Sequence, residues 1–189
     1  MGFWVLWHSQ DNNYISFGKV KILPSSVYQV LNFGYGNVAL AIDPITGETL
    51  FYTDGALVYN YLNEPMQGVV GELGGMEDER QTVAIAELDF EPQGGNRLFY
   101  TFYITPGGQL EYAIMDMNDQ GGAPSNQPPA GSVSPGGTIG PSEGPIIVIK
   151  APGQPSFLIS FENGQVISRE ILIKKGNSEP PVHSLGFHS

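Results

Sequence analysis

The sequence predicts an all-β protein, and three features of its composition lead to that class. Glycine (25) and proline (15) together make up 40 of the 189 residues, or about 21%, whereas about 12% is usual. Such a chain turns often and is not expected to form long helices. Charged residues make up 14% of the chain, against a usual value of about 25%. Aromatic residues, at 11%, lie mostly within Val/Ile/Leu runs, which favours strands.

Composition also excludes several classes of function. The chain has 8 Lys plus Arg against 19 Asp plus Glu, a net charge of −11, so it repels phosphate backbones and anionic membranes, and we expect no nucleic-acid binding. Cysteine is absent, which excludes disulfides, thiol catalysis and cysteine-ligated metals. No stretch approaches the roughly 18 apolar residues of a membrane span. The apolar run near the amino terminus lacks the basic region of a signal peptide, so we also expect no secretion signal.

One stretch, Asn37–Asn60, shows the organisation most clearly. Val38–Ile42 is apolar and β-prone, and Asp43–Gly47 has the residues of a tight turn. Thr49–Thr53 then alternates aromatic and polar residues, and a second turn leads into Ala56–Tyr59. The pattern predicts a meander of three strands.

Looser copies of this meander account for the rest of a single predicted domain, 1–189. The blade-like units lie near 3–36, 37–81, 82–117 and 146–175, with a Gly/Pro-rich loop at 118–145 and a tail at 176–189. The strands expected outside the second unit are Phe3–Trp7, Tyr14–Ile22, Val27–Leu31, Thr82–Leu88, Arg97–Ile104, Leu110–Met117, Ile146–Lys150, Phe157–Phe161 and Gln165–Ile173. Asn163-Gly164, between the last two, is the strongest hairpin signal in the chain.

Two segments are predicted to be irregular. Residues 118–145 have almost no apolar side chains to bury, so we expect a long surface loop or a disordered one. Tyr61–Arg80 is polar, Gly-rich and acidic, and is typical of a surface loop. The tail has one small apolar patch, Val182–Phe187, which could supply a missing strand to the first unit.

The spacing of the units predicts a propeller. They start near residues 3, 38, 83 and 146, so the intervals are 35, 45 and 63 residues, and the last shortens to 35 without residues 118–145. Repeats of about 40 to 50 residues with three or four strands each are typical of propeller blades. We expect a small, about four-bladed β-propeller-like repeat fold; the alternative is a β-sandwich of short strands.

Several stretches also resemble a known family. GETLFYTDGALVYNYLNEPMQG resembles a blade of the WD-repeat-like propeller domains in bacterial gliding-motility-associated and type IX-secreted surface proteins. QTVAIAEL, RLFYTFYITPGGQLEYAIMDM and ILIKKGNSEPPVHSLG are similar to later motifs of that family. Those domains are longer and follow a secretion signal, which we do not expect here. The resemblance implies a propeller fold and an adhesive or scaffolding role, with no catalytic residues to carry over.

Motifs for chemistry are weak. Gly140–Gly144 matches G-x-S-x-G, but a nucleophile elbow needs a strand before it and a helix after it, so coincidence is favoured. His8, His183 and His188 could hold zinc if the chain ends meet, yet their spacing favours surface roles. Asp116–Gly121 begins like a calcium loop, but Gln127 stands where a bidentate Glu belongs. We expect no metal and no cofactor.

Acidic and aromatic clusters allow two further interpretations. Glu72, Glu77, Asp78 and Glu79 could include a general acid–base pair, although a solvated acidic patch is favoured for carboxylates clustered in a polar loop. Phe3, Trp4 and Trp7 could stack on sugars if exposed, although core packing is favoured.

The leading hypothesis is a non-enzymatic structural or adhesive protein that forms a homo-oligomer or a larger assembly. A virion component (a phage capsid-decoration, fibre or tail-associated protein) or a cell-surface component fits the acidic, Gly/Pro-rich sequence without a secretion signal. The alternatives are a glycan-binding propeller module and, less favoured, a glycoside hydrolase. The residues we expect to contact a ligand or partner are Trp4, Trp7, His8, Asp54, Tyr59 and Tyr61.

Overall fold

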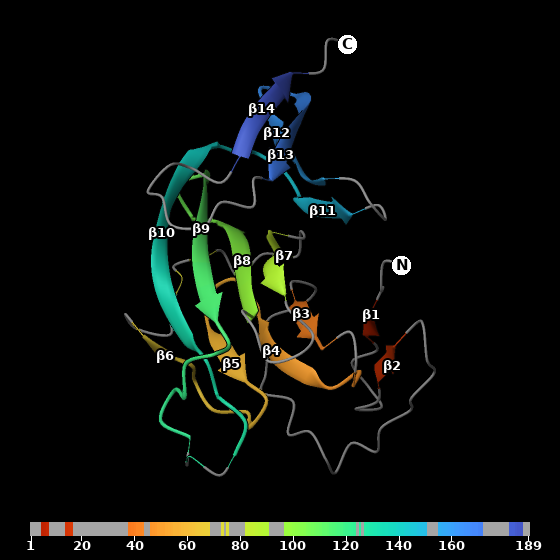
Figure 1. Cartoon of the computed structure of the whole chain (residues 1–189). Helices are drawn as coiled ribbons and strands as arrows, with labels where there is room; N and C mark the ends of the chain where they lie inside the picture. The colour runs from red at the N-terminus through yellow and green to blue at the C-terminus, as the bar shows by residue number, and fades with distance from the viewer. Residues whose placement is uncertain are drawn as a thin grey trace.

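A computed structural model shows the chain as a set of β-strands (Figure 1). It describes residues 5–7, 14–16, 38–43, 46–68, 73, 75, 82–90, 97–123, 125, 127–150, 155–171 and 182–186. Strands, and no helices, occur in these ranges, so the predicted all-β class is confirmed. In the same ranges there is accordingly no helix long and apolar enough to span a membrane.

The described strands form four sheets. A hairpin contains β1 (Val5–Trp7) and β2 (Tyr14–Ser16), and a three-stranded meander contains β3 (Ala39–Ile42), β4 (Thr49–Thr53) and β5 (Val58–Asn60). The five-stranded sheet has the order β6 (Gln67–Gly68), β10 (Ser132–Pro141), β9 (Gln109–Asp116), β8 (Arg97–Ile104) and β7 (Val83–Phe90). The four-stranded sheet has the order β11 (Ile147–Lys150), β12 (Ser156–Glu162), β13 (Gln165–Ile171) and β14 (Val182–Gly186). Among the described strands, every pair is antiparallel except β6–β10, which is parallel.

Local sequence explains most of these elements. The predicted strands Thr49–Thr53 and Arg97–Ile104 coincide with β4 and β8. Asn163 and Gly164 connect β12 to β13 with φ values of 51° and 72°, as a two-residue type I′ turn requires. The predicted strand Val27–Leu31 lies outside the described residues.

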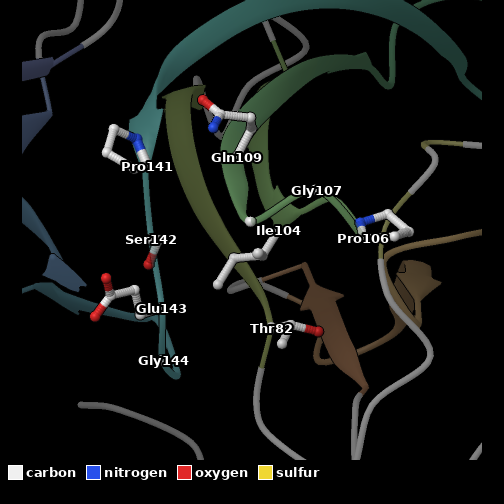
Figure 2. A pocket seen from close by; sticks show the side chains of 10 residues that line it. Thr82, Ile104, Pro106, Gly107, Gln109, Pro141, Ser142, Glu143 and Gly144 are labelled. Atoms are coloured by element: carbon white, nitrogen blue, oxygen red, sulfur yellow. The ribbon is translucent and has the colours of Figure 1, made fainter. Parts of the chain in front are cut away.

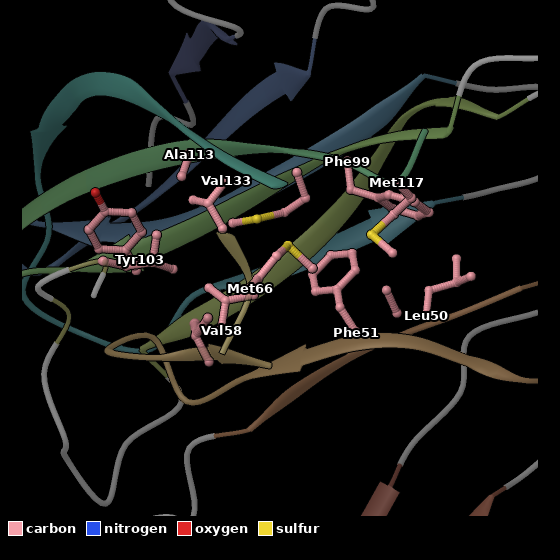
Figure 3. Packing of buried hydrophobic residues seen from close by; sticks show 13 residues of the cluster. Leu50, Phe51, Val58, Met66, Phe99, Tyr103, Ala113, Met117 and Val133 are labelled. Carbon is pink, nitrogen blue, oxygen red and sulfur yellow. The ribbon is translucent and has the colours of Figure 1, made fainter. Parts of the chain in front are cut away.

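The last three sheets stack face to face in chain order. The meander β3–β5 buries Phe51 and Val58 against one face of the five-stranded sheet, where Phe99 meets the Phe51 ring edge-on at 5.4 Å (Figure 3). The opposite face of that sheet packs on β11–β13 through Phe102 and Leu158. The central sheet is therefore covered on both sides, and every residue of β8 from Phe99 to Ile104 is buried.

Contacts between the sheets recur at corresponding places. The first strands of consecutive sheets touch, β3 with β7 and β7 with β11. Ion pairs join the same neighbours: Arg97 Nη2 lies 3.5 Å from Asp43 Oδ2, and Lys150 Nζ lies 2.8 Å from Glu87 Oε2. The Lys150–Glu87 pair is exposed and contributes little stability, whereas the Asp43 side chain of the other pair is only 5% exposed. Among the described strands no sheet closes on itself.

The prediction of an irregular loop over 118–145 is wrong for its second half. Ser132–Pro141 forms β10, which pairs with β9 along its length. Glycine is needed at position 136 for this pairing, because a Cβ there would lie 2.4 Å from the ring of Tyr112. Backbone pairing and close approach, which need no apolar side chains, hold β10 in place.

The tail also differs from its prediction. Val182–Gly186 forms β14, which pairs with β13 in the last sheet rather than with the first unit. Strands that follow each other in the chain usually pair with each other, and β14 follows β13. The last sheet thereby gains a fourth strand, as β10 provides for the sheet before it.

Tyr103 on β8 gives this core a pH dependence. Its hydroxyl donates to Glu111 Oε2 at 3.2 Å, and burial, followed by the Glu111 charge and hydrogen bond, raises the pKa of Tyr103 to about 12. An unfolded tyrosine has a pKa of about 10. The stabilisation that the neutral Tyr103 hydroxyl contributes to the folded state is therefore complete below about pH 10 and is lost as the pH rises towards about 12.

We expect Tyr103→Phe to lose less stability than the wild type between these pH values, because phenylalanine cannot ionise. Urea unfolding at neutral and alkaline pH measures the difference. Equal alkaline losses in the two proteins would contradict the assignment. The loss that remains in the variant is expected to include Tyr52, whose pKa is also raised to about 12, chiefly by burial.

Candidate functional site

Two of the four exposed large apolar residues in the described part of the chain, Ile149 and Val166, lie on the outward side of the last sheet. Cross-strand partners in the register place Ile147 beside Ile159, Ile149 beside Phe157, and Phe161 beside Val166. We call these six residues of β11–β13 the outer face. Ile149 is 50% exposed and Val166 43%, and the other four are half-buried. None belongs to either buried apolar cluster.

The outer face follows from apolar residues at successive positions. In β12 the residues between Phe157, Ile159 and Phe161 are Leu158 and Ser160, which are both fully buried, and Leu158 packs against the central sheet. A strand that is apolar on both sides is typical of a sheet covered on both sides. This face was not predicted from the sequence, although β12 and Ile147–Ile149 both have apolar residues at successive positions.

The same pattern is covered elsewhere in the chain. Tyr100, Phe102 and Ile104 alternate along β8 as Phe157, Ile159 and Phe161 do along β12, and the β8 side chains are buried under β11–β13. The outer face therefore has the same alternation of apolar residues as the face of β8 that packs against another sheet.

Three of the predicted contact residues lie in or beside the meander β3–β5. Asp54 is buried, and its Oδ1 accepts from the N–H groups of Ala56 and Leu57 at 2.9 and 2.8 Å, so it fixes the turn between β4 and β5. Tyr59 stacks on Tyr52, with ring centroids 5.4 Å apart and an interplanar angle of 18°. Tyr61 donates its hydroxyl to the carbonyl of Pro128 at 2.8 Å.

Tyr52 is the member of this group that sequence reasoning missed. It lies directly opposite Tyr59 in the β4–β5 register, and its hydroxyl donates to Asn63 Oδ1 at 2.9 Å. Cross-strand aromatic pairing was the available signal. Of the other predicted contacts, Trp7 belongs to β1, whereas Trp4 and His8 lie outside the described residues.

An open pocket of about 390 Å³ lies at one end of the central sheet, between the β8–β9 turn and the β10–β11 connection (Figure 2). Ser142, from the G-x-S-x-G letters, lies in its wall and is 2% exposed. Ser142 follows β10 and precedes β11, with no helix in the connection. The strand–turn–helix geometry of a nucleophile elbow is therefore absent here.

The acidic residues tested for metal binding serve the backbone instead. Asp116 Oδ1 accepts from the N–H of Asn118 at 2.8 Å, and Asp119 Oδ1 accepts from the N–H of Gly121 at 3.0 Å. The Gly121 hydrogen bond and one from the Ser132 side chain lower the pKa of Asp119. Within the ranges that the structure describes, no three His, Asp or Glu side chains converge. Glu72, Glu77, Asp78, Glu79 and His188 lie outside those ranges, and His183 belongs to β14.

Comparison of the chain with protein-family models, with curated proteins and with solved structures finds no match.

Proposed function

We propose that the protein is a non-enzymatic structural or adhesive component of a larger assembly and that it binds protein partners, including copies of itself, through the outer face. The observation that carries the proposal is the apolar character of this face beside the covered, equivalent face of the central sheet. Exposed apolar patches of this kind in a soluble protein mark interaction sites.

The architecture that we propose is propeller-like. The sheets β3–β5, β7–β10 and β11–β14 would be consecutive blades, with β1–β2 belonging to a further unit before β3–β5, in a ring that leaves the outer face of the last blade open. Two findings support this arrangement: the sheets stack in chain order, and the first strand of each touches the first strand of the next. In Figure 1 these first strands, β3, β7 and β11, lie towards the middle of the molecule. A sandwich of two sheets would not produce this recurrence.

The setting that we propose is a virion, as a capsid-decoration, fibre or tail-associated protein, or a cell surface. An acidic chain rich in Gly and Pro and the resemblance to adhesive propeller domains support it. Repeated weak contacts between copies suit both settings, because many of them add up in a lattice.

A glycan-binding module is the second candidate function. The stacked Tyr52–Tyr59 pair and the nearby Tyr61 favour it, because sugar-binding sites use aromatic rings as platforms. A glycan array that gives no signal with the wild type would remove this candidate. Catalysis by loop carboxylates is the weakest of the proposals.

The proposed function is tested by Ile149→Glu, which places a charge on the most exposed apolar residue of the outer face. We expect the wild type to associate as its concentration rises in sedimentation velocity and the variant to remain monomeric. Because the side chain is half exposed, the urea midpoint should change little. Leu62→Glu is the matched control: Leu62 is 37% exposed, lies in the turn after β5, and should leave association unchanged. A wild type that stays monomeric and binds no particle would refute the proposal.

A further inference from the structure

The two-residue turn between β12 and β13 exposes an asparagine–glycine pair to solvent. Asn163 and Gly164 are both exposed and have left-handed φ values of 51° and 72°. Glu162 and Gln165 form the pair that closes the hairpin, so the ladder of the two strands does not use the Gly164 N–H. Within the described ranges, the structure shows no hydrogen bond to the Asn163 side chain or from the Gly164 N–H.

This pair has the chemistry for deamidation without an enzyme. The backbone nitrogen after an asparagine can attack the side-chain amide carbon, and glycine hinders that attack least because it has no side chain and bends its backbone most freely. A Cβ built on Gly164 would meet no other part of the described chain within 4 Å. The turn therefore has room for the backbone rotation that ring closure needs.

The other described asparagines lack this combination. Asn63 has a similar φ, 62°, but its Oδ1 accepts from the Tyr52 hydroxyl at 2.9 Å. The N–H that follows it, on Glu64, donates to Asn60 Oδ1 at 3.1 Å. Asn60 itself is buried, and the Asn118 amide donates to a neighbouring carboxylate at 2.8 Å. The structure thus distinguishes Asn163 from each of them.

We propose that Asn163 is a site of spontaneous modification, for which water is the only co-reactant. The Gly164 nitrogen loses its proton to hydroxide and attacks Asn163 Cγ. The new N–Cγ bond closes a succinimide, and the amide nitrogen takes a proton from water and leaves as ammonia. Water then opens the ring: opening at Cγ gives aspartate in an ordinary backbone, and opening at the α-carbonyl gives isoaspartate, with the chain running through Cβ and Cγ. This inference is independent of the proposed function.

The two products act differently on the last sheet. Aspartate is tolerated at a left-handed turn position and only adds a negative charge beside Glu162. Isoaspartate lengthens the backbone between Glu162 and Gln165 by a methylene group. Because a two-residue turn sets the register of its hairpin, the longer turn strains the β12–β13 pairing. That pairing also positions the buried Arg169 beside Glu162.

The test is peptide mapping by mass spectrometry during incubation at mildly alkaline pH, which favours loss of the Gly164 proton. We expect the mass gain of an amide-to-acid exchange at Asn163, and a much slower one at Asn63, the matched control within the same chain. The protein unfolded in guanidinium chloride gives the rate of the same pair without the turn. Asn163→Gly, which keeps a residue suited to the left-handed turn, should show no gain in that peptide.

The outcomes decide both parts of the proposal. Faster modification at Asn163 than at Asn63 in the folded protein supports it. Modification at Asn163 only after unfolding, or at the same rate as Asn63, overturns it, because the turn would then protect the pair.

The isoaspartate form, separated by reversed-phase chromatography and refolded, is expected to unfold at a lower urea concentration than Asn163→Asp. Equal midpoints would overturn the effect assigned to the longer backbone.

Discussion

Truncating Phe102 to alanine is expected to lower the free energy of unfolding by about 3–5 kcal/mol, the usual range for a fully buried phenylalanine. Phe102 is 0% exposed and lies on the face of β8 that packs under β11–β13. Its loss would leave a cavity between two sheets that have few ways to collapse onto each other. Urea unfolding followed by fluorescence or circular dichroism measures the change.

Phe157→Ala is the matched control, because Phe157 occupies the corresponding position on β12 but is only half-buried. We expect it to cost about 1 kcal/mol or less at low protein concentration. Similar costs for the two substitutions would mean that the outer face is covered within a single chain. That result would contradict the stacking order of the sheets. It would also mean that the outer face is not open to a partner, as the proposed function requires.

The second large effect is expected at Arg169, a charged side chain buried between the last two sheets. It is 5% exposed; its Nη1 donates to the Ser160 hydroxyl, and its Nη2 lies 3.3 Å from Glu162 Oε2. Burial lowers the pKa of the guanidinium, and the Glu162 carboxylate counteracts that shift. The arginine thus combines a desolvated charge with two polar partners.

We expect Arg169→Ala to destabilise the protein by about 2–3 kcal/mol, somewhat less than the 3–5 typical of a fully buried pair, because the Glu162 side chain is 30% exposed. Arg169→Met keeps the apolar stem and should retain more stability than the alanine variant. Urea midpoints of the three proteins give the comparison. If the alanine and methionine variants were equally stable, the lost packing of the stem would not contribute and only the charge would matter.

Sequence reasoning located strands well where side-chain patterns carry the information. β4 and β8 were predicted to the residue, and the Asn163-Gly164 turn was identified from its two side chains. It missed β10, because that strand is held by backbone hydrogen bonds and by a glycine against the Tyr112 ring. Neither interaction leaves a pattern of apolar residues along the strand.

The candidate site was less accessible from the sequence. Tyr59 and Tyr61 were selected, but Asp54 proved to be a turn residue, and the outer face was not selected at all. Composition around β12 shows apolar residues on both sides of the strand. It does not show which side another sheet covers, so a core residue and a surface residue look alike.

By itself the sequence determined an all-β chain, cysteine-free and acidic, with meanders connected by turns of identifiable chemistry, because backbone preference and side-chain alternation are local properties. The tertiary structure alone decided the order of stacking, the position of the tail beside β13, and which of two equivalent apolar faces is covered. Those features depend on contacts between residues far apart in the chain. The free energy of burying a side chain depends on what lies opposite it, and the residue itself does not encode that neighbour.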